Sequence, residues 1–272
     1  MPFDQLIVLA VIQGLTEFLP ISSSGHLNLV HLLTSWQDEG PLVDVAIHVG
    51  SLGAVMLYFW RDMAMFLRAI WQFTKGRITP EFKLLLYLIV ATLPIFAVGY
   101  FVVKMGLLDD LRTAKVIAWS NMGFALVLLF CDRVGMTVQR IEHTTLGDAV
   151  LIGVAQVLSV IPGASRAGLT ISMARYLGYE RPEAARISML LSIPTILGLG
   201  LATAWELQSS GNLDLQRDAI LAGALSLVAA LISISFMMWM AQRMTLLPFV
   251  VYRIVLGGFL LGWIYANEGG LF

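Results

Sequence analysis

The sequence predicts an all-α integral membrane protein with six transmembrane helices plus two re-entrant helical hairpins in an inverted-topology repeat. Three observations lead to this prediction: a composition too apolar for a water-soluble domain, six apolar runs long enough to cross a bilayer, and two apolar stretches broken by proline and small polar residues. We expect one membrane domain over residues 1–272, with repeat halves of approximately 1–135 and 145–272.

The composition indicates lipid as the natural solvent. Of 272 residues, 58% are hydrophobic and 13% are charged, and the mean hydropathy is +0.82. A soluble domain is about 25% charged, so this chain has too few charges to cover a water-exposed surface. The net charge of -1 excludes the basic face that nucleic acid requires. The single cysteine, Cys131, excludes an internal disulfide.

Six apolar runs have the length of a spanning helix, which is roughly 20 residues. They cover residues 42–60, 82–104, 113–131, 183–207, 218–241 and 247–266. A cleaved signal peptide begins with basic residues. The first apolar segment has none before it, so we expect this segment to be retained.

Two further apolar stretches, 3–35 and 146–178, are each interrupted near the middle. The first break covers Pro20–His26 and the second covers Pro162–Gly168. Proline disfavours helix in the residue before it, so the first half-helices should end near Leu19 and Ile161. Each half is too short to span. We therefore expect two re-entrant hairpins, whose irregular backbone is tolerated only where protein or a wet cavity surrounds it.

The two breaks also align without gaps, with Pro20 on Pro162 and Ser23 on Ser165. Each hairpin is followed by three spans, and an odd number of spans turns the second unit upside down relative to the first. This is the inverted-repeat plan, in which broken helices form a site at the membrane midplane.

The loop charges predict the orientation, because Lys and Arg concentrate on the cytoplasmic side. One alternating set of loops contains most of them: Arg61, Arg68, Lys75, Arg77, Lys83, Arg133, Arg140, Arg175, Arg181, Arg186 and Arg243. The other set contains Lys104, Arg112, Lys115 and Arg217. Both termini should then be periplasmic. The Ser23 hairpin should open to the outside and the Arg166 hairpin to the cytoplasm.

Two arginines, Arg166 and Arg253, fall in apolar surroundings. A charge at the bilayer centre costs about 2.5–3.5 kcal/mol on insertion scales, so such residues are functional candidates. Arg166 follows a helix break, where free backbone amides and a guanidinium together suit phosphate. It could instead pair with a buried acid. Arg253 could supply a second phosphate contact or extend to an interface.

Glu17 is the only acid deep in the first hairpin, and Gln13 lies on the same helix face four residues earlier. Carboxylate and amide oxygens suit a hard divalent cation, Mg²⁺ or Ca²⁺, with phosphate and water completing its coordination. The alternatives are a neutral, hydrogen-bonded Glu17 and a Gln13 that joins helices.

Ser22, Ser23 and Ser24 precede the second half-helix. One of them is expected to cap that helix. Ser23 is also a candidate nucleophile, because His26 lies three residues later, on the same helix face. A Ser-x-x-His pair is a weak signal by itself, since it occurs often by chance.

With these motifs, the sequence resembles the bacitracin-resistance family of undecaprenyl-pyrophosphate phosphatases over nearly the whole chain. The first family motif matches residues 13–26, the second matches residues 162–170, and a third similarity covers residues 188–195. This chain departs from the family in having Gln13 where many members have Glu, Ala167 where Ser is usual and Ser24 where Thr is common.

The resemblance implies hydrolysis of undecaprenyl pyrophosphate to the monophosphate at the outer face of the bacterial inner membrane, with a divalent cation. The product is the carrier lipid for peptidoglycan synthesis, and the activity confers bacitracin resistance. Glu17, Ser23, His26 and Arg166 would be catalytic, and Gln13 and Glu17 would bind the metal. Ser22, Ser24, Ser165, Thr170 and Arg253 are the candidate substrate-binding residues.

Two mechanisms remain open at this stage: attack by Ser23, with His26 or Glu17 taking its proton, or direct attack by a metal-activated water. The second function class is a transporter or flippase of a phosphorylated polyprenyl lipid, because inverted repeats with broken helices are also a transporter plan. The lipid bilayer is an expected partner. The sequence leaves the oligomeric state open, with a homodimer as one candidate.

Overall fold

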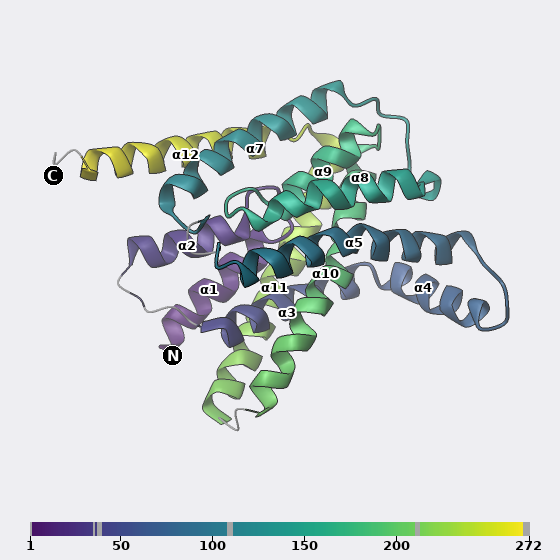
Figure 1. The fold of residues 1–272 in the computed structure, drawn as a ribbon, viewed down its shortest axis with the longest axis horizontal. Helices are drawn as coiled ribbons and strands as arrows, with labels where there is room; N and C mark the ends of the chain where they lie inside the picture. Colours follow the sequence, from purple (N-terminus) through teal and green to yellow (C-terminus); the bar gives the residue numbers. More distant parts are fainter. Residues whose placement is uncertain (1, 35, 37–39, 108–110, 210–212, 269–272) are drawn as a thin grey trace.

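A computed structural model describes residues 2–34, 36, 40–107, 111–209 and 213–268, and these form a helical bundle (Figure 1). No strand occurs in the described part, which contains one isolated bridge between Gln139 and Tyr179. The elements in chain order are α1 (Phe3–Thr16), α2 (Ser23–Leu33), α3 (Gly40–Tyr58), α4 (Trp60–Phe73), α5 (Pro80–Lys104), α7 (Ala114–Val134), η1 (Ile141–His143), α8 (Leu146–Val157), η2 (Leu158–Val160), α9 (Arg166–Tyr176), α10 (Arg181–Ser209), α11 (Leu213–Arg243) and α12 (Leu247–Glu268).

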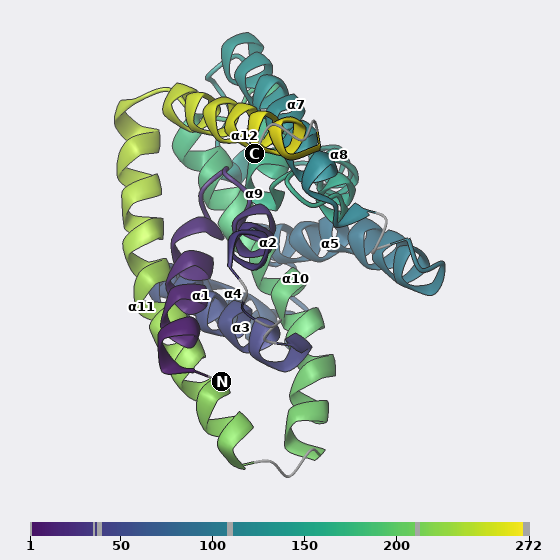
Figure 2. The same ribbon diagram turned by 90° about the vertical axis from the view of Figure 1, so that its left-hand side faces the viewer.

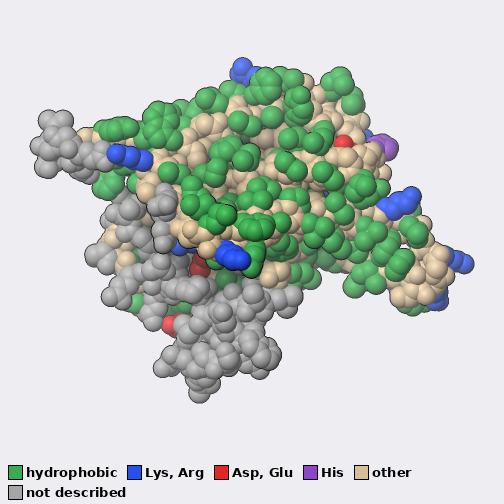
Figure 3. Space-filling view, viewed as in Figure 1, with side chains coloured by type: hydrophobic (Ala, Val, Ile, Leu, Met, Phe, Trp, Pro, Cys, Tyr) green, Lys and Arg blue, Asp and Glu red, His purple; other side chains and the backbone are tan. Residues whose placement is uncertain are grey.

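Four helices within the described residues are long and apolar enough to cross a membrane: Pro80–Lys104, Ala114–Val134, Gln216–Arg243 and Leu247–Ala266. A fifth candidate is the pair Val43–Tyr58 and Trp60–Phe73, which is bent by 83°. Hydrophobic side chains cover much of the visible outer surface (Figure 3). The chain is therefore a multi-pass membrane protein, as its composition predicted.

The predicted runs coincide with helices but not with six equal spans. The 42–60 run corresponds to α3, and the helix direction changes at Phe59, beyond which α4 leaves at 83°. The 183–207 run lies inside α10, a 29-residue helix that is not among the four apolar spans found in the described residues.

The two proline-containing stretches break where helix was expected to fail. The α8–η2 segment ends at Val160, next to the predicted Ile161. The first half-helix ends at Thr16, three residues before Leu19, because residues 17–21 form a turn in which Ile21 N donates to Leu19 O. Each break is followed by a helix of 11 residues, α2 or α9.

The breaks share one unusual backbone conformation. Ser22 and Ser165 have φ values of 74° and 71°, in the left-handed region that non-glycine residues rarely adopt. Each caps the following helix, since the Ser22 hydroxyl accepts from Gly25 N and the Ser165 hydroxyl accepts from Gly168 N.

These caps correct the sequence alignment by one residue. Ser22, not Ser23, is the counterpart of Ser165, and Ser23 corresponds to Arg166. The gapless alignment failed because the second loop has one more residue between proline and cap, and that loop contains Gly163 at φ 89°. The expectation that one of the three serines caps the helix is confirmed for Ser22.

The helix packing links the two halves of the chain. The first half-helix α1 packs on α11, α8 packs on α5, α3 contacts both α11 and α10, and α7 lies along α12. Figure 2 shows α1 beside α11, and both ribbon views show α7 beside α12. Glycine permits two of these approaches, because a Cβ at Gly14 would lie 2.5 Å from Ser226 O and one at Gly153 would lie 2.5 Å from Ala91 O.

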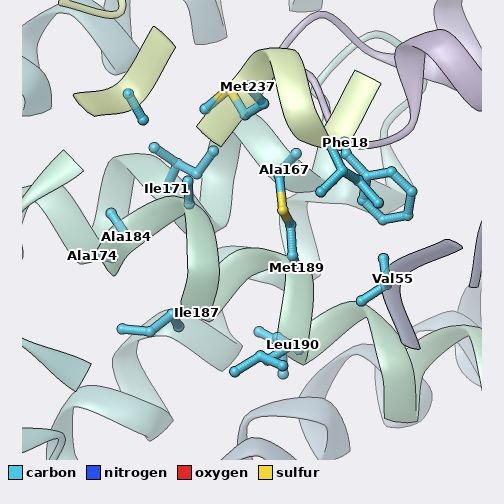
Figure 4. Packing of buried hydrophobic residues seen from close by; sticks show 14 of the residues in the cluster. Phe18, Val55, Ala167, Ile171, Ala174, Ala184, Ile187, Met189, Leu190 and Met237 are labelled. Atoms are coloured by element: carbon cyan, nitrogen blue, oxygen red, sulfur yellow. The ribbon is translucent and has the colours of Figure 1, made fainter. Parts of the chain in front are cut away.

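The main core joins the first loop to the second hairpin. Figure 4 shows Phe18 from the first loop and Ala167 from α9 in one packed group, near Met189 of α10 and Met237 of α11. Each directly follows a polar residue of the candidate site: Phe18 follows Glu17, and Ala167 follows Arg166. Their burial therefore fixes where the two polar side chains meet.

Candidate active site

The central residue of the candidate site is Glu17, the buried carboxylate that follows α1. Its Oε2 accepts hydrogen bonds from Ser23 Oγ at 2.7 Å and from Gln13 Nε2 at 2.9 Å. Its Oε1 accepts from Arg166 Nη2 at 3.0 Å. One carboxylate thus contacts α1, the start of α2 and the start of α9, and it joins two hairpins that are 149 residues apart in sequence.

Arg166 lies at the first position of α9, and its side chain is 12% exposed. Besides the ion pair with Glu17, its Nη1 donates to Ser188 O of α10 at 3.1 Å. The sequence left open whether Arg166 binds phosphate or pairs with a buried acid. The structure shows the second arrangement, and the acid with which Arg166 pairs is Glu17, the other candidate residue.

Thr170 contacts the backbone of Arg166 one helical turn along α9. Its hydroxyl donates toward the backbone oxygen of Arg166 and lies 2.7 Å from Ser188 Oγ. Thr170 is fully buried, which places it among the contacts that orient Arg166 and away from an open site. Ser22 and Ser165 are likewise engaged as helix caps and are buried.

Ser23 and Ser24 differ from these buried serines. Ser23 is partly exposed and Ser24 is exposed, and both lie in the first turn of α2. Backbone amides in a first turn have no acceptor within their own helix and attract anions. The α2 start therefore offers two hydroxyls and free amides beside the carboxylate of Glu17, and the α9 start offers amides beside the guanidinium of Arg166.

The two hydrogen bonds of the His26 ring go to Ser22 and Tyr252, and not to Ser23, its predicted partner. Its Nδ1 lies 2.7 Å from Ser22 O and its Nε2 lies 2.6 Å from Tyr252 Oη. Its ring stacks on Tyr252 with centroids 5.7 Å apart. Both ring nitrogens are therefore occupied, and the group within reach of the Ser23 proton is Glu17.

His48, for which the sequence left open a supporting role or a simple pairing with Asp44, also lies in this cluster. Its Nε2 lies 3.8 Å from Glu17 Oε2, and its Nδ1 lies 2.7 Å from Asp44 O and 3.5 Å from Asp44 Oδ1. The available signal was the Asp44–His48 pair, spaced one helical turn apart inside an apolar helix. That spacing does not reveal which element the histidine faces.

Arg253, for which the sequence left open a phosphate contact or an interfacial location, contacts both loops. The side chain is fully buried in α12. Its Nη1 donates to Pro20 O of the first loop at 3.2 Å, and its Nη2 donates to Gly163 O and Ala164 O of the second loop at 2.9 and 3.0 Å. Its Nε donates to Asn121 Oδ1 at 2.8 Å. In this geometry Arg253 joins the two loops.

The residues predicted to bind metal are of a suitable type. Gln13 is fully buried, and its Oε1 has no hydrogen-bond partner, although its Nε2 donates to Glu17. A buried acceptor without a donor is costly, and amide and carboxylate oxygens are ligands that a hard cation binds. Within the described residues no group of three His, Cys, Asp or Glu side chains forms a protein-only cage.

Comparison with known proteins identifies the family. The model of the bacitracin resistance protein BacA family matches residues 6–259. The chain belongs to this family. It is also 45% identical to the undecaprenyl-diphosphatase of Jannaschia sp. (strain CCS1) over 96% of this chain and 98% of that protein. The undecaprenyl-diphosphatase of Roseobacter denitrificans is 44% identical over 98% of this chain and all of that protein, and the one of Alteromonas mediterranea is 45% identical with the same coverage.

Proposed function

We propose that this protein hydrolyses undecaprenyl pyrophosphate to undecaprenyl phosphate and inorganic phosphate, and so recycles the carrier lipid for cell-wall synthesis and confers bacitracin resistance. The observation that carries the proposal is the contact of Glu17 with both Ser23 and Arg166. Membership of a family whose similar relatives are undecaprenyl-diphosphatases supports the substrate.

Substrate binding rests on positive charge and amides from two helix starts. Arg166 would exchange part of its pairing with Glu17 for the pyrophosphate, to which a planar guanidinium can donate two hydrogen bonds. The first-turn amides of α2 and the hydroxyl of Ser24 would hold the terminal phosphoryl group. Phosphoryl transfer depends mainly on such positioning and electrostatic stabilisation.

The geometry supports Ser23 as the nucleophile and Glu17 as its base. Ser23 Oγ would form a bond to the terminal phosphorus while the bond from that phosphorus to the bridging oxygen breaks. Glu17 Oε2, at 2.7 Å, takes the hydroxyl proton. Undecaprenyl phosphate leaves with the bridging oxygen. A water molecule then cleaves the phosphoserine, gives inorganic phosphate and restores the hydroxyl.

The competing mechanism has no covalent intermediate. A water molecule in the position of the Ser23 hydroxyl would attack directly, and Glu17 would again take the proton. The two mechanisms differ in whether radioactive phosphate from labelled substrate remains on acid-quenched protein, and in whether Ser23→Ala keeps its activity.

A divalent cation would be held by Glu17 and by Gln13, whose Oε1 has no hydrogen-bond partner. When bound, Mg²⁺ or Ca²⁺ would offset negative charge on the phosphate oxygens. The chain's own contribution is to keep the Gln13 and Glu17 side chains in contact, four residues apart.

The finer membrane arrangement is also a proposal: six spans, two re-entrant hairpins and an inverted repeat in the inner membrane. The reciprocal packing of α1 on α11 and α8 on α5 supports it, as do the matching caps at Ser22 and Ser165. Loop charges favour periplasmic termini and a site that opens to the periplasm. A homodimer stays a prediction, which a mass measurement in detergent would test.

A transporter or flippase of the same lipid is the second candidate, because the paired broken helices favour it. Phosphate release by purified protein in detergent separates the two functions. We expect release that requires a divalent cation and is lost in Glu17→Ala and Arg166→Ala. No release by folded wild type with cation present would refute the phosphatase, and lipid movement in liposomes would then be measured.

A further inference from the structure

The helix α4 lies outside the candidate site and has three different faces. With 3.6 residues per turn, residues seven and eleven positions apart share a side of a helix. One side is buried and contains Asp62, Phe66 and Ala69. The other two sides are exposed, one apolar and one basic.

The apolar side carries large hydrophobic residues that are exposed at the protein surface. Trp60, Leu67 and Trp71 are 60%, 67% and 60% exposed, and Ile70 lies beside them at 42%. The spacing of Trp60, Leu67 and Trp71 places them in one stripe. α4 is also the most amphipathic of the helices and one of the less hydrophobic ones.

The basic side is formed by Arg61 and Arg68, seven residues apart and both exposed. Lys75 follows in the turn after α4, and its Nζ lies 3.5 Å from the centre of the Trp71 ring. The Arg61 guanidinium lies 5.4 Å from the Trp60 ring. Figure 3 shows Lys and Arg side chains gathered over the turn that joins α4 to α5. Arg61 and Lys75 thus lie against the tryptophans of the apolar stripe.

The buried side fixes α4 to the rest of the molecule. Arg186 of α10 forms an ion pair with Asp62, and the Phe73 ring stacks on Phe82 of α5 at 4.3 Å. α4 leaves the apolar helix α3 at 83°, so it runs almost at right angles to that helix. A helix in this orientation, with Trp and Leu on one face and cations on another, has the features of a helix in the membrane–water interface.

We propose that α4 lies in the interface of the leaflet that faces the Arg- and Lys-rich loops, and that Arg61, Arg68 and Lys75 bind the headgroups of anionic phospholipids. The apolar stripe would enter the acyl region, and the cations beside it would reach the phosphates. The partner is a phospholipid with net negative charge, such as phosphatidylglycerol. This inference does not depend on the proposed phosphatase activity.

The depth of α4 can be measured with nitroxide labels in phosphatidylglycerol-containing vesicles. Leu67→Cys and Arg68→Cys, each with Cys131→Ser, place labels on adjacent residues of different faces. We expect the Leu67 label to be more accessible to oxygen than to a nickel chelate, and the Arg68 label to show the reverse. Two labels that both favour the nickel chelate would overturn the interfacial location. A Leu67 label protected from both reagents would mean that protein covers this face, which would also overturn it.

The headgroup preference needs a second measurement, energy transfer from tryptophan to dansyl-phosphatidylglycerol or dansyl-phosphatidylcholine. Cations near a membrane surface favour anionic lipid by about fivefold each, so wild type should prefer the anionic probe at least about fivefold. The triple variant R61Q/R68Q/K75Q should lose that preference. The matched control R133Q/R140Q/R243Q removes three exposed arginines from other loops of the same set and should retain it.

The controls make the outcome decisive. Equal transfer to both probes in wild type, or a preference lost in the R133Q/R140Q/R243Q control but kept in the α4 variant, would contradict the proposal. Thermal unfolding of each variant separates a loss of lipid preference from a loss of folded protein.

Discussion

At the scale of single residues, the candidate site depends on one carboxylate with several partners. Glu17 accepts from Ser23, Gln13 and Arg166, and His48 lies within 3.8 Å. A carboxylate that activates a serine and also anchors an arginine keeps both groups in place before substrate arrives. Preorganised contacts of this kind lower the cost of reaching the transition state.

Glu17→Gln should abolish most phosphatase activity while the shape of the side chain is kept. General-base catalysis contributes about 10²- to 10⁴-fold to a rate, so we expect kcat to fall at least about 100-fold. The measurement is phosphate release, with thermal unfolding as the check on folding. A kcat within threefold of wild type would exclude Glu17 as the base.

His48→Ala should reduce activity on the order of tenfold, the size of effect seen when a supporting contact of a reactive group is removed. The expected change is in kcat and in the pH profile, with KM little altered. His143→Ala is the matched control, because His143 is exposed and lies in η1, away from Glu17. Equal effects of the two substitutions would show that His48 has no special relation to the site.

The sequence was sufficient for the local part of the site and insufficient for the rest. Gln13 and Glu17 share a helix face, and a four-residue spacing reveals this. The Arg166–Glu17 contact was expected only from the inverted-repeat plan, in which both broken helices contribute to one site at the membrane midplane. The role of Arg253 depends on carbonyl groups far away in the chain, and the Tyr252–His26 contact spans 226 residues, so no local pattern predicts either one.

At the scale of elements, the two broken segments are held together by an arginine from a third. Arg253 of α12 donates to Pro20 O in one loop and to Gly163 O and Ala164 O in the other. Buried carbonyl groups need donors, and loops have fewer of them than helices. The fork shape of the guanidinium lets one side chain serve both loops.

Arg253→Lys should destabilise the protein, although the charge is kept, because an ammonium cannot reach acceptors on all sides. Hydrogen bonds to charged groups contribute about 1.5–3 kcal/mol each, so loss of even two should lower the free energy of unfolding by about 3 kcal/mol. Thermal unfolding in detergent measures this. Arg243→Lys, at an exposed site, should leave the stability unchanged, and an equal result for the two would contradict the proposed role.

Helix boundaries were predicted more accurately than helix directions. Proline and the serine caps mark both breaks, so the second one was located within a residue. The bend of 83° between α3 and α4 was not predicted, because no proline marks the junction. Phe59 alone separates the two helices. The change from a uniformly apolar to an amphipathic pattern after residue 59 was the available signal.

At the scale of the whole molecule, the interlocked packing explains how distant loops form one site. α1 packs on α11 from the second half, and α8 packs on α5 from the first. Each hairpin is thereby supported by the opposite half, and the tips meet where Glu17 contacts Arg166. Loop charge, and not this packing, supports the orientation in the membrane.

Orientation can be tested with a membrane-impermeant maleimide on intact cells. Lys75→Cys and Lys104→Cys, each with Cys131→Ser, lie in loops assigned to opposite sides, and both side chains are exposed. The charge bias predicts labelling of the cysteine at 104 in intact cells and of the one at 75 only after lysis. The reverse pattern would invert the assignment of the termini.

The most direct test of the account is a double-mutant cycle between Ser23→Ala and Arg166→Ala, measured as kcat/KM for undecaprenyl pyrophosphate. Groups that act together in one site lose their effects non-additively. If both hairpins form a single catalytic site, the double variant should lose about as much kcat/KM as the more damaged single variant. Losses that multiply would mean that Ser23 and Arg166 act independently, and would contradict a site built from both hairpins.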